Sequence, residues 1–249
     1  MNDEPKDETL RGLAPPKSRQ PIFLMPPAVL VFCGILLAIQ AAMSLFLNDL
    51  AQQEVLTWFA FVPYRLLDAV HVEGGWLPLI WTPFTHALLH AGWEHVILNT
   101  VWFAVFATPL TQRYGAPRMF ILFFVGAAFG AVAFAATTLP QIQVLLGASG
   151  GIAALTGAAM RFIFQPPVVE VDSETGEKRL VGRRLATLPE FFANSRARNF
   201  SLIWVGLNAV VPLVAMATQS QALQIAWQTH LAGFIAGLLL VPLLERRPS

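Results

Sequence analysis

Long apolar segments alternate with polar connections along most of the chain, and this pattern predicts its architecture. A helix needs about 20 mainly apolar residues to cross the hydrocarbon of a bilayer. Six segments reach or approach that length: 26–47, 94–110, 118–138, 148–164, 200–217 and 227–243. The sequence therefore predicts an all-α membrane protein with six transmembrane helices. The second and fourth segments are short or carry polar residues, so we expect the other helices to enclose them.

Composition supports a bilayer as the solvent of this chain. Apolar residues make up 55% of the 249 residues and charged residues only 12%, whereas soluble domains carry about 25% charge. So few charges would cover the surface of a soluble protein poorly. The formal net charge of +1 gives no basis for a nucleic-acid partner, so we expect none.

The distribution of basic residues predicts the orientation in the membrane. With the amino terminus in the cytosol, all of the 16 basic residues except Arg65 lie on the cytosolic side, as the positive-inside rule requires. We therefore expect both termini in the cytosol. The membrane domain then spans 26–243, between a disordered polar tail at 1–25 and a short tail at 244–249. A compact six-helix chain without a recognisable targeting leader fits a bacterial inner membrane best.

Two connections are long enough to have structure of their own. Residues 165–199 alternate apolar and polar positions around Thr175-Gly176, which predicts a small cytosolic β-hairpin. Residues 48–93 contain an apolar stretch, Val55 to Tyr64, that is too short to cross a bilayer. Its aromatic content and the charges that follow predict an interfacial segment in the outer leaflet.

Ionisable residues at membrane depth are costly, so each one is a hypothesis about function. The chain has five histidines, and three of them, His86, His90 and His95, lie in one window before and within the second apolar segment. His230 opens the last segment. His71 lies in the long outer connection, where we expect a surface residue.

Small residues surround Ser149 at the outer end of the fourth segment and also follow His230. Small residues spaced four apart let membrane helices approach closely, and by themselves they indicate packing only. Because Ser149 and His230 both lie at the outward ends of their helices, such packing would bring them together. The small residues in question are Gly147, Gly150, Gly233 and Gly237.

A serine and a histidine in contact are the minimum for nucleophilic catalysis. A serine hydroxyl needs a neighbouring base, and His230 can take its proton and return it to a leaving amine. His95 and Asn99 are four apart and share a helix face; with the Ser149 backbone N–H they are donors for an oxyanion. No Asp or Glu lies within the last segment, so we expect a dyad.

The motifs HALLHAGWEHVILN, GASGGIAALTG and HLAGFIAG, in this order, resemble those of the rhomboid intramembrane serine proteases. The resemblance covers residues 26–243 and implies a six-helix bundle. It implies that Ser149 is the nucleophile and His230 the general base and acid, with His95 and Asn99 stabilising the oxyanion. It also implies that the substrates are single-span membrane proteins cut near the outer membrane boundary, and that no metal or cofactor takes part.

Two positions depart from the pattern of that family. Many members have Trp-Arg in the first outer loop, where this chain has Trp81-Thr82, so an interaction that shapes the loop is missing. Many also have an aromatic residue one turn after the serine, against the catalytic histidine. This chain has Ala153 there, which leaves open what orients His230.

Three other functions compete with proteolysis. His86 and His90 are four apart, but they lack the Glu of the zinc motif His-Glu-x-x-His; we assign them to hydrogen bonds that brace the outer loop. A catalytically silent rhomboid-like protein would bind membrane clients, and it would need neither Ser149 nor His230. A transporter would use Asn208 with the histidines as a relay, but transporters often contain internal repeats and this sequence shows none. We expect Asn208 instead to form an interhelical hydrogen bond or a polar contact near the substrate entrance.

Overall fold

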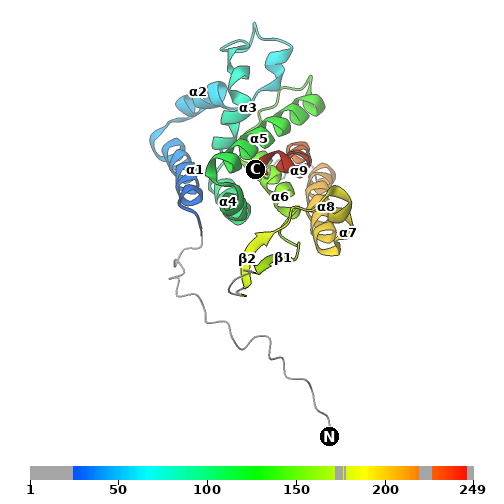
Figure 1. The fold of residues 1–249 in the computed structure, drawn as a ribbon. Helices are drawn as coiled ribbons and strands as arrows, with labels where there is room; N and C mark the ends of the chain where they lie inside the picture. Colours follow the sequence, from blue (N-terminus) through cyan, green and yellow to red (C-terminus); the bar gives the residue numbers. More distant parts are fainter. Residues whose placement is uncertain (1–24, 172–175, 177, 219–225, 246–249) are drawn as a thin grey trace.

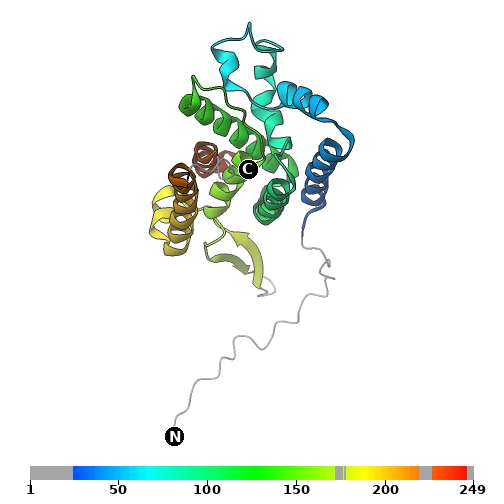
Figure 2. The same cartoon turned by 180° about the vertical axis from the view of Figure 1, so that it is seen from behind.

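The computed structural model describes residues 25–171, 176, 178–218 and 226–245. The predicted tail at 1–25, apart from Met25, and the last four residues lie outside this range. The longer elements are α1 (Pro27–Phe46), α2 (Asp49–Phe59), α3 (Thr82–Thr85), α4 (Trp93–Tyr114), α5 (Ala116–Thr138), α6 (Ser149–Met160), β1 (Pro167–Val171), β2 (Lys178–Arg183), α7 (Leu188–Ala193), α8 (Ser195–Thr218) and α9 (Trp227–Leu240). Short 3-10 helices lie at Pro63–Leu66, Leu77–Ile80, His86–Leu88 and Val241–Leu244. Figures 1 and 2 show α1 and α8 at opposite edges of a helix bundle.

The chain is an integral membrane protein by the length and apolar character of its helices. All six apolar segments predicted from the sequence are helical. Within the described residues, three helices are long and apolar enough to cross a bilayer: Pro27–Phe46, Ala116–Thr138 and Trp227–Leu244. The apolar helix α6 is shorter. The total of six spans and the cytosolic location of both termini stay predictions.

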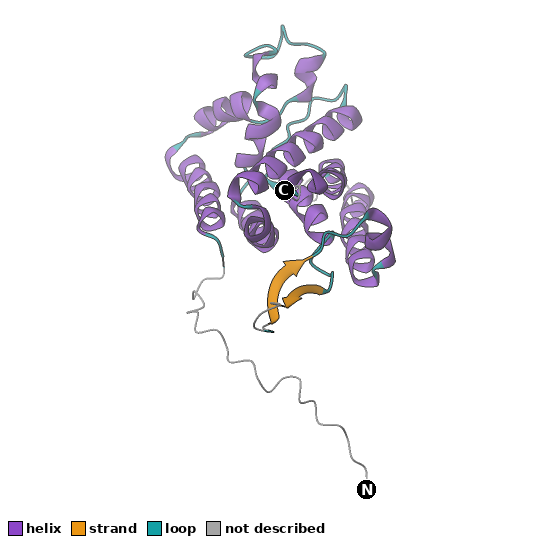
Figure 3. Cartoon of the chain, viewed as in Figure 1, coloured by secondary structure: helices purple, strands orange, loops and turns teal. Residues whose placement is uncertain are grey.

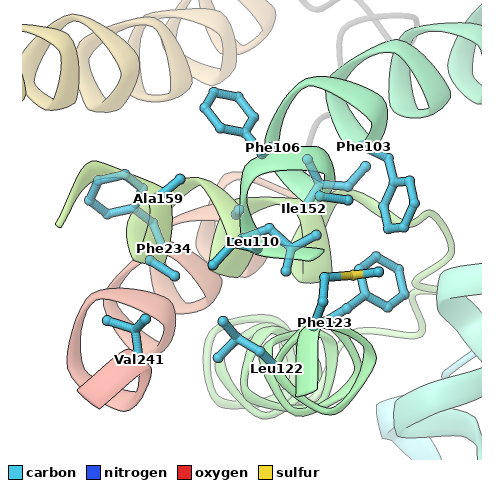
Figure 4. Close-up of a cluster of buried hydrophobic side chains, with 14 of the residues drawn as sticks. Phe103, Phe106, Leu110, Leu122, Phe123, Ile152, Ala159, Phe234 and Val241 are labelled. Atoms are coloured by element: carbon cyan, nitrogen blue, oxygen red, sulfur yellow. The ribbon is translucent and has the colours of Figure 1, made fainter. Parts of the chain in front are cut away.

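Helix α6 forms the centre of the bundle. Every residue from Gly150 to Met160 is buried, which confirms that this segment is enclosed. Figure 4 shows apolar side chains of α4, α5, α6 and α9 meeting around it. The same expectation is wrong for α4, whose Ile97, Leu98 and Val101 are exposed. Only one face of α4 packs against other helices, and the opposite face is apolar enough for lipid contact.

The two strands lie at one end of the bundle, and α2 and α3 lie at the other (Figure 3). Strand β1 pairs with β2 in antiparallel fashion, in the segment where the sequence predicts a hairpin. At this end Arg161 donates hydrogen bonds to the carbonyl oxygens of Ala186 (2.7 Å) and Leu238 (2.6 Å). Arg113 of α4 pairs with Glu245 at 2.7 Å. These bonds join the ends of α4, α6 and the last helix.

The opposite end is formed by residues 48–93, which contain an arginine buried inside a loop. Arg65 as a whole residue is 2% exposed, although the sequence suggests only a charge in an outer loop. Its guanidinium donates to the carbonyl oxygens of Thr57 (2.7 Å), Gly75 (2.9 Å) and Glu73. Arg65 thus stabilises the conformation of this loop. An interaction that shapes the loop was expected to be missing, because the chain has Trp81-Thr82 where many members of the family have Trp-Arg.

The substitution Arg65→Leu should destabilise this loop. It leaves three carbonyl groups without their donor, and a hydrogen bond to a charged group contributes about 1.5–3 kcal/mol. We expect a melting temperature in detergent clearly below that of the native chain. The matched control is His71→Ala, because the side chain of His71 is 81% exposed in the same loop and, among the described residues, hydrogen-bonds only to Asp68. Equal melting temperatures for the two variants would contradict this role.

Candidate active site

The turn before α6 is held by the two buried histidines of the outer loop. The Gly147 N–H donates to the carbonyl oxygen of His86 (2.9 Å), and the Ala148 N–H donates to His90 Nε2 (3.4 Å). Gly147 has a φ of +119°, which residues with a side chain rarely adopt. The turn therefore requires glycine, and it starts α6 at Ser149.

Both histidines are neutral in this position. Burial lowers the pKa of His86 to about 4, and burial followed by the nearby His95 lowers the pKa of His90 to about 3. Neutral His90 is needed here because its Nε2 accepts a hydrogen bond. His86 Nδ1 donates to the carbonyl oxygen of Thr82 (2.9 Å). The two side chains bond to different backbone groups, and the described residues contain no group of three His, Cys, Asp or Glu side chains able to hold a metal ion.

Helices α6 and α9 run parallel and touch backbone to backbone. A β-carbon added at Gly233 would overlap the carbonyl oxygen of Gly150, and one added at Gly237 would overlap the carbonyl oxygen of Ala154. Each successive turn of α6 thus meets the corresponding turn of α9. The close approach predicted from the small residues is present.

This register puts Ser149 and His230 at the same end of neighbouring helices. A β-carbon at Gly150 would lie 2.7 Å from the Thr229 methyl group, so the residue after Ser149 contacts the residue before His230. Both Ser149 and His230 are partly exposed. In the part of the chain that the structure describes, Ser149 Oγ and the His230 ring form no direct hydrogen bond.

His95 lies against the turn that precedes Ser149. A β-carbon at Gly147 would be 2.9 Å from His95 Nε2. The Ala91 N–H donates to His95 Nδ1 (3.4 Å), so the neutral ring carries its hydrogen on Nε2. Asn99 is buried one turn further along α4, and its amide donates one hydrogen to the His95 carbonyl oxygen (2.9 Å). The second amide hydrogen of Asn99 is available to a ligand.

The His230 ring has a partner on α8 that the sequence does not identify. Its Nδ1 lies 2.5 Å from Oδ1 of Asn208. The sequence predicts an interhelical hydrogen bond, or a polar contact near the substrate entrance, for Asn208; the bond between α8 and α9 confirms the first of these. An amide on one helix carries no sequence signal that it contacts a histidine 22 positions away. The aromatic neighbour of His230 is Trp204, with ring centroids 6.5 Å apart.

A third helix, α5, also takes part in the close packing. A β-carbon at Gly126 would overlap the Ala154 side chain, and one at Gly130 would lie 2.5 Å from the Thr229 methyl group. The Thr229 hydroxyl donates to the Gly130 carbonyl oxygen (3.3 Å). The sequence contains a signal for this contact, because Gly126 and Gly130 are four apart, but close packing was expected only between the fourth and sixth segments.

Residues 78–169 match the family model of the rhomboid domain. Over these residues the chain is similar to the rhomboid family. This finding confirms the resemblance inferred from the motifs. The matched region includes His95, Asn99 and Ser149, and it ends before Asn208 and His230.

Two curated relatives share the name of this family. The human "Rhomboid-related protein 3" is 36% identical over 81 residues, which are 32% of this chain and 19% of that protein. The Bacillus subtilis (strain 168) "Putative rhomboid protease YdcA" is 34% identical over 122 residues, which are 49% of this chain and 57% of that protein. The chain thus spans about a fifth and just over half of the lengths of the two relatives.

Proposed function

We propose that this chain is an intramembrane serine endopeptidase in which Ser149 is the nucleophile and His230 is the general base and acid. The observation that carries the proposal is the parallel backbone contact between α6 and α9, with Ser149 and His230 at its same end. The proposed fold has six membrane spans and both termini in the cytosol. The proposed location is a bacterial inner membrane.

The proposed reaction uses the free nitrogen of His230. Because Nδ1 of His230 donates to the side-chain oxygen Oδ1 of Asn208, Nε2 of the neutral ring carries a lone pair. Nε2 takes the Ser149 hydroxyl proton as Oγ attacks the substrate carbonyl carbon, and it then gives that proton to the leaving amine. A water molecule, deprotonated in turn by Nε2, hydrolyses the Ser149 ester and releases the second product.

Donors near Ser149 would stabilise the oxyanion of each tetrahedral intermediate. His95 Nε2–H is next to the turn at Gly147, and the Asn99 amide has one hydrogen to offer. The Ser149 N–H lies in the first turn of α6, where backbone N–H groups have no partner within the helix. Without substrate, catalytic hydrogen bonds are often long and shorten only in the complex, which is compatible with the open Ser149–His230 geometry.

The proposed substrates are single-span membrane proteins, cut near the outer membrane boundary. The name of the Bacillus subtilis relative includes the word protease, and that of the human relative states only a relation to rhomboids. The rival function is that of a catalytically silent protein that binds membrane clients. The polar groups gathered at one end of α6 and α9 favour catalysis, because binding alone requires neither a nucleophile nor a base.

The proposal is tested by incubating the purified chain with a single-span substrate whose helix is destabilised near its outer end. We expect two products, with the cleaved bond mapped by mass near the outer boundary, and no products from a Ser149→Ala preparation purified in parallel. Co-isolation of intact substrate without any product would support the client-binding function. Equal cleavage by the two preparations would show that a contaminating protease is responsible.

The substitution Asn99→Ala should slow cleavage without abolishing it. Loss of one oxyanion donor typically costs about 10²- to 10³-fold in kcat, while other donors remain. The matched control on the same helix is Thr108→Ala, because among the described residues the Thr108 hydroxyl bonds only to the Ala104 carbonyl oxygen of its own helix (2.6 Å). An unchanged kcat for Asn99→Ala would remove Asn99 from the oxyanion site.

A further inference from the structure

We propose that Asn208 is the positioning residue of His230, so that it extends the proposed dyad to a Ser149–His230–Asn208 triad. The inference rests on the proposed function. It starts from the 2.5 Å contact between Asn208 Oδ1 and His230 Nδ1, which joins α8 to α9. A carbonyl oxygen can only accept, so the ring nitrogen must donate. The contact therefore selects the ring form with hydrogen on Nδ1.

The amide itself is held in the orientation that this bond needs. Asn208 Nδ2 donates to the carbonyl oxygen of Trp204 (2.8 Å), one turn earlier on α8. With its NH₂ group bound there, the amide turns its oxygen toward α9. Rotating the amide by half a turn would place Oδ1 against the Trp204 carbonyl oxygen, and two acceptors cannot bond to each other. The orientation of Asn208 is thus set by its own helix before substrate binds.

Aromatic packing aligns the two helices one turn away from the bond. The Trp204 and Phe234 rings stack with centroids 4.9 Å apart and planes 22° apart. Phe234 lies one turn after His230 on α9, and Trp204 lies one turn before Asn208 on α8. The stack and the hydrogen bond therefore fix the same register between α8 and α9. Trp204 also lies beside the His230 ring (6.5 Å between centroids).

The consequence for catalysis is that Nε2 is left unprotonated and accessible to Ser149. A histidine whose Nδ1–H is bonded to an acceptor has a defined ring form and orientation. In serine proteases with a carboxylate in this place, the wrong ring form lowers kcat by about 10⁴-fold. An amide oxygen also accepts from the protonated ring, so the bond persists when His230 holds the serine proton. Asn208 thus orients the His230 ring, a role that Ala153 cannot fill because it has no aromatic side chain.

Two substitutions separate positioning from packing. Asn208→Leu has nearly the same shape but no acceptor, and we expect kcat to fall about 10- to 100-fold with little change in KM. Asn208→Asp keeps an oxygen that accepts from Nδ1–H, and we expect a kcat closer to that of the native chain than to Asn208→Leu. The matched control is Ser201→Ala on the same helix, because the Ser201 hydroxyl bonds only to the Ala197 carbonyl oxygen (2.8 Å) within the part of the chain that the structure describes.

The ring form can be read without any activity. In the ¹⁵N-histidine NMR spectrum of the Ser149→Ala chain in detergent, His230 is identified by the signals lost in a further His230→Gln variant. We expect hydrogen on Nδ1 in the presence of Asn208, and a mixture of both ring forms in Asn208→Leu. Hydrogen on Nε2 with Asn208 present, or the same spectrum in Asn208→Leu, would overturn the inference.

The outcomes separate this inference from the proposed function. A native chain that fails to cleave substrate contradicts the protease function, while the NMR measurement still decides whether Asn208 sets the ring form. A native chain that cleaves, together with an unchanged kcat in Asn208→Leu, overturns the positioning role alone. A raised KM at constant kcat would assign Asn208 to substrate binding and also overturn it.

Discussion

Ser149→Ala and His230→Ala are each expected to lower kcat for a single-span substrate by about 10⁴- to 10⁶-fold, while the chain stays folded. Alanine at 149 leaves no nucleophile, and alanine at 230 leaves the Ser149 hydroxyl without a base. Both side chains lie at the partly exposed end of the α6–α9 contact, so their truncation opens no cavity in the buried core. Melting temperatures in detergent should therefore stay near that of the native chain.

The double variant sharpens this prediction. When two residues act in the same catalytic step, removing the second after the first has little further effect on kcat. Ser149→Ala/His230→Ala should therefore be no slower than either single variant. Two independent contributions would instead multiply. A single variant that is folded and retains turnover, or a double variant that is much slower than both singles, would contradict a shared step.

Gly233→Leu is expected to damage stability and activity together. Any side chain at this position meets the backbone of α6, because a β-carbon would overlap the Gly150 carbonyl oxygen and lie 3.2 Å from the Ala153 methyl group. Backbone cannot move aside as a flexible side chain can, and overpacking commonly costs about 1–3 kcal/mol or more. The helices must separate, which also moves His230 away from Ser149. We expect a lower melting temperature and loss of cleavage.

Gly34→Leu on α1 is the matched control for this substitution. A β-carbon at Gly34 would have no neighbour within 4 Å, and Gly34 lies in a helix apolar enough to cross the bilayer. Leucine also favours helix over glycine by about 1 kcal/mol. The control should therefore melt at or slightly above the native temperature and keep its activity. Equal losses in the two variants would mean that the α6–α9 contact has no special role.

The sequence predicts the helices well because apolar segments of membrane length leave little choice of structure. It also anticipates the α6–α9 contact, since small residues four apart follow both Ser149 and His230. It does not anticipate that α5 joins that contact through Gly126 and Gly130. One small-residue pair indicates that a helix packs closely, but it does not name the partner.

Polar contacts between distant segments are the part that the sequence leaves out. Arg65 reads as a charge in an outer loop, but its guanidinium is enclosed by carbonyl groups 8 to 10 residues away. The sequence predicts an interhelical hydrogen bond for Asn208 but does not identify His230 as its partner, because the partner depends on the rotation of α8 about its axis relative to α9. Such rotation is set by packing, here by Trp204 against Phe234, which no periodicity in the sequence records.

The most direct measurement of the central claim is labelling of the purified chain with a fluorophosphonate probe, followed by mapping of the modified residue by mass. A serine reacts with such a probe when a base activates its hydroxyl. We predict one adduct, on Ser149, that is lost in Ser149→Ala and strongly slowed in His230→Ala. An adduct on another residue, or labelling of Ser149 that is unaffected by His230→Ala, would contradict activation of Ser149 by His230.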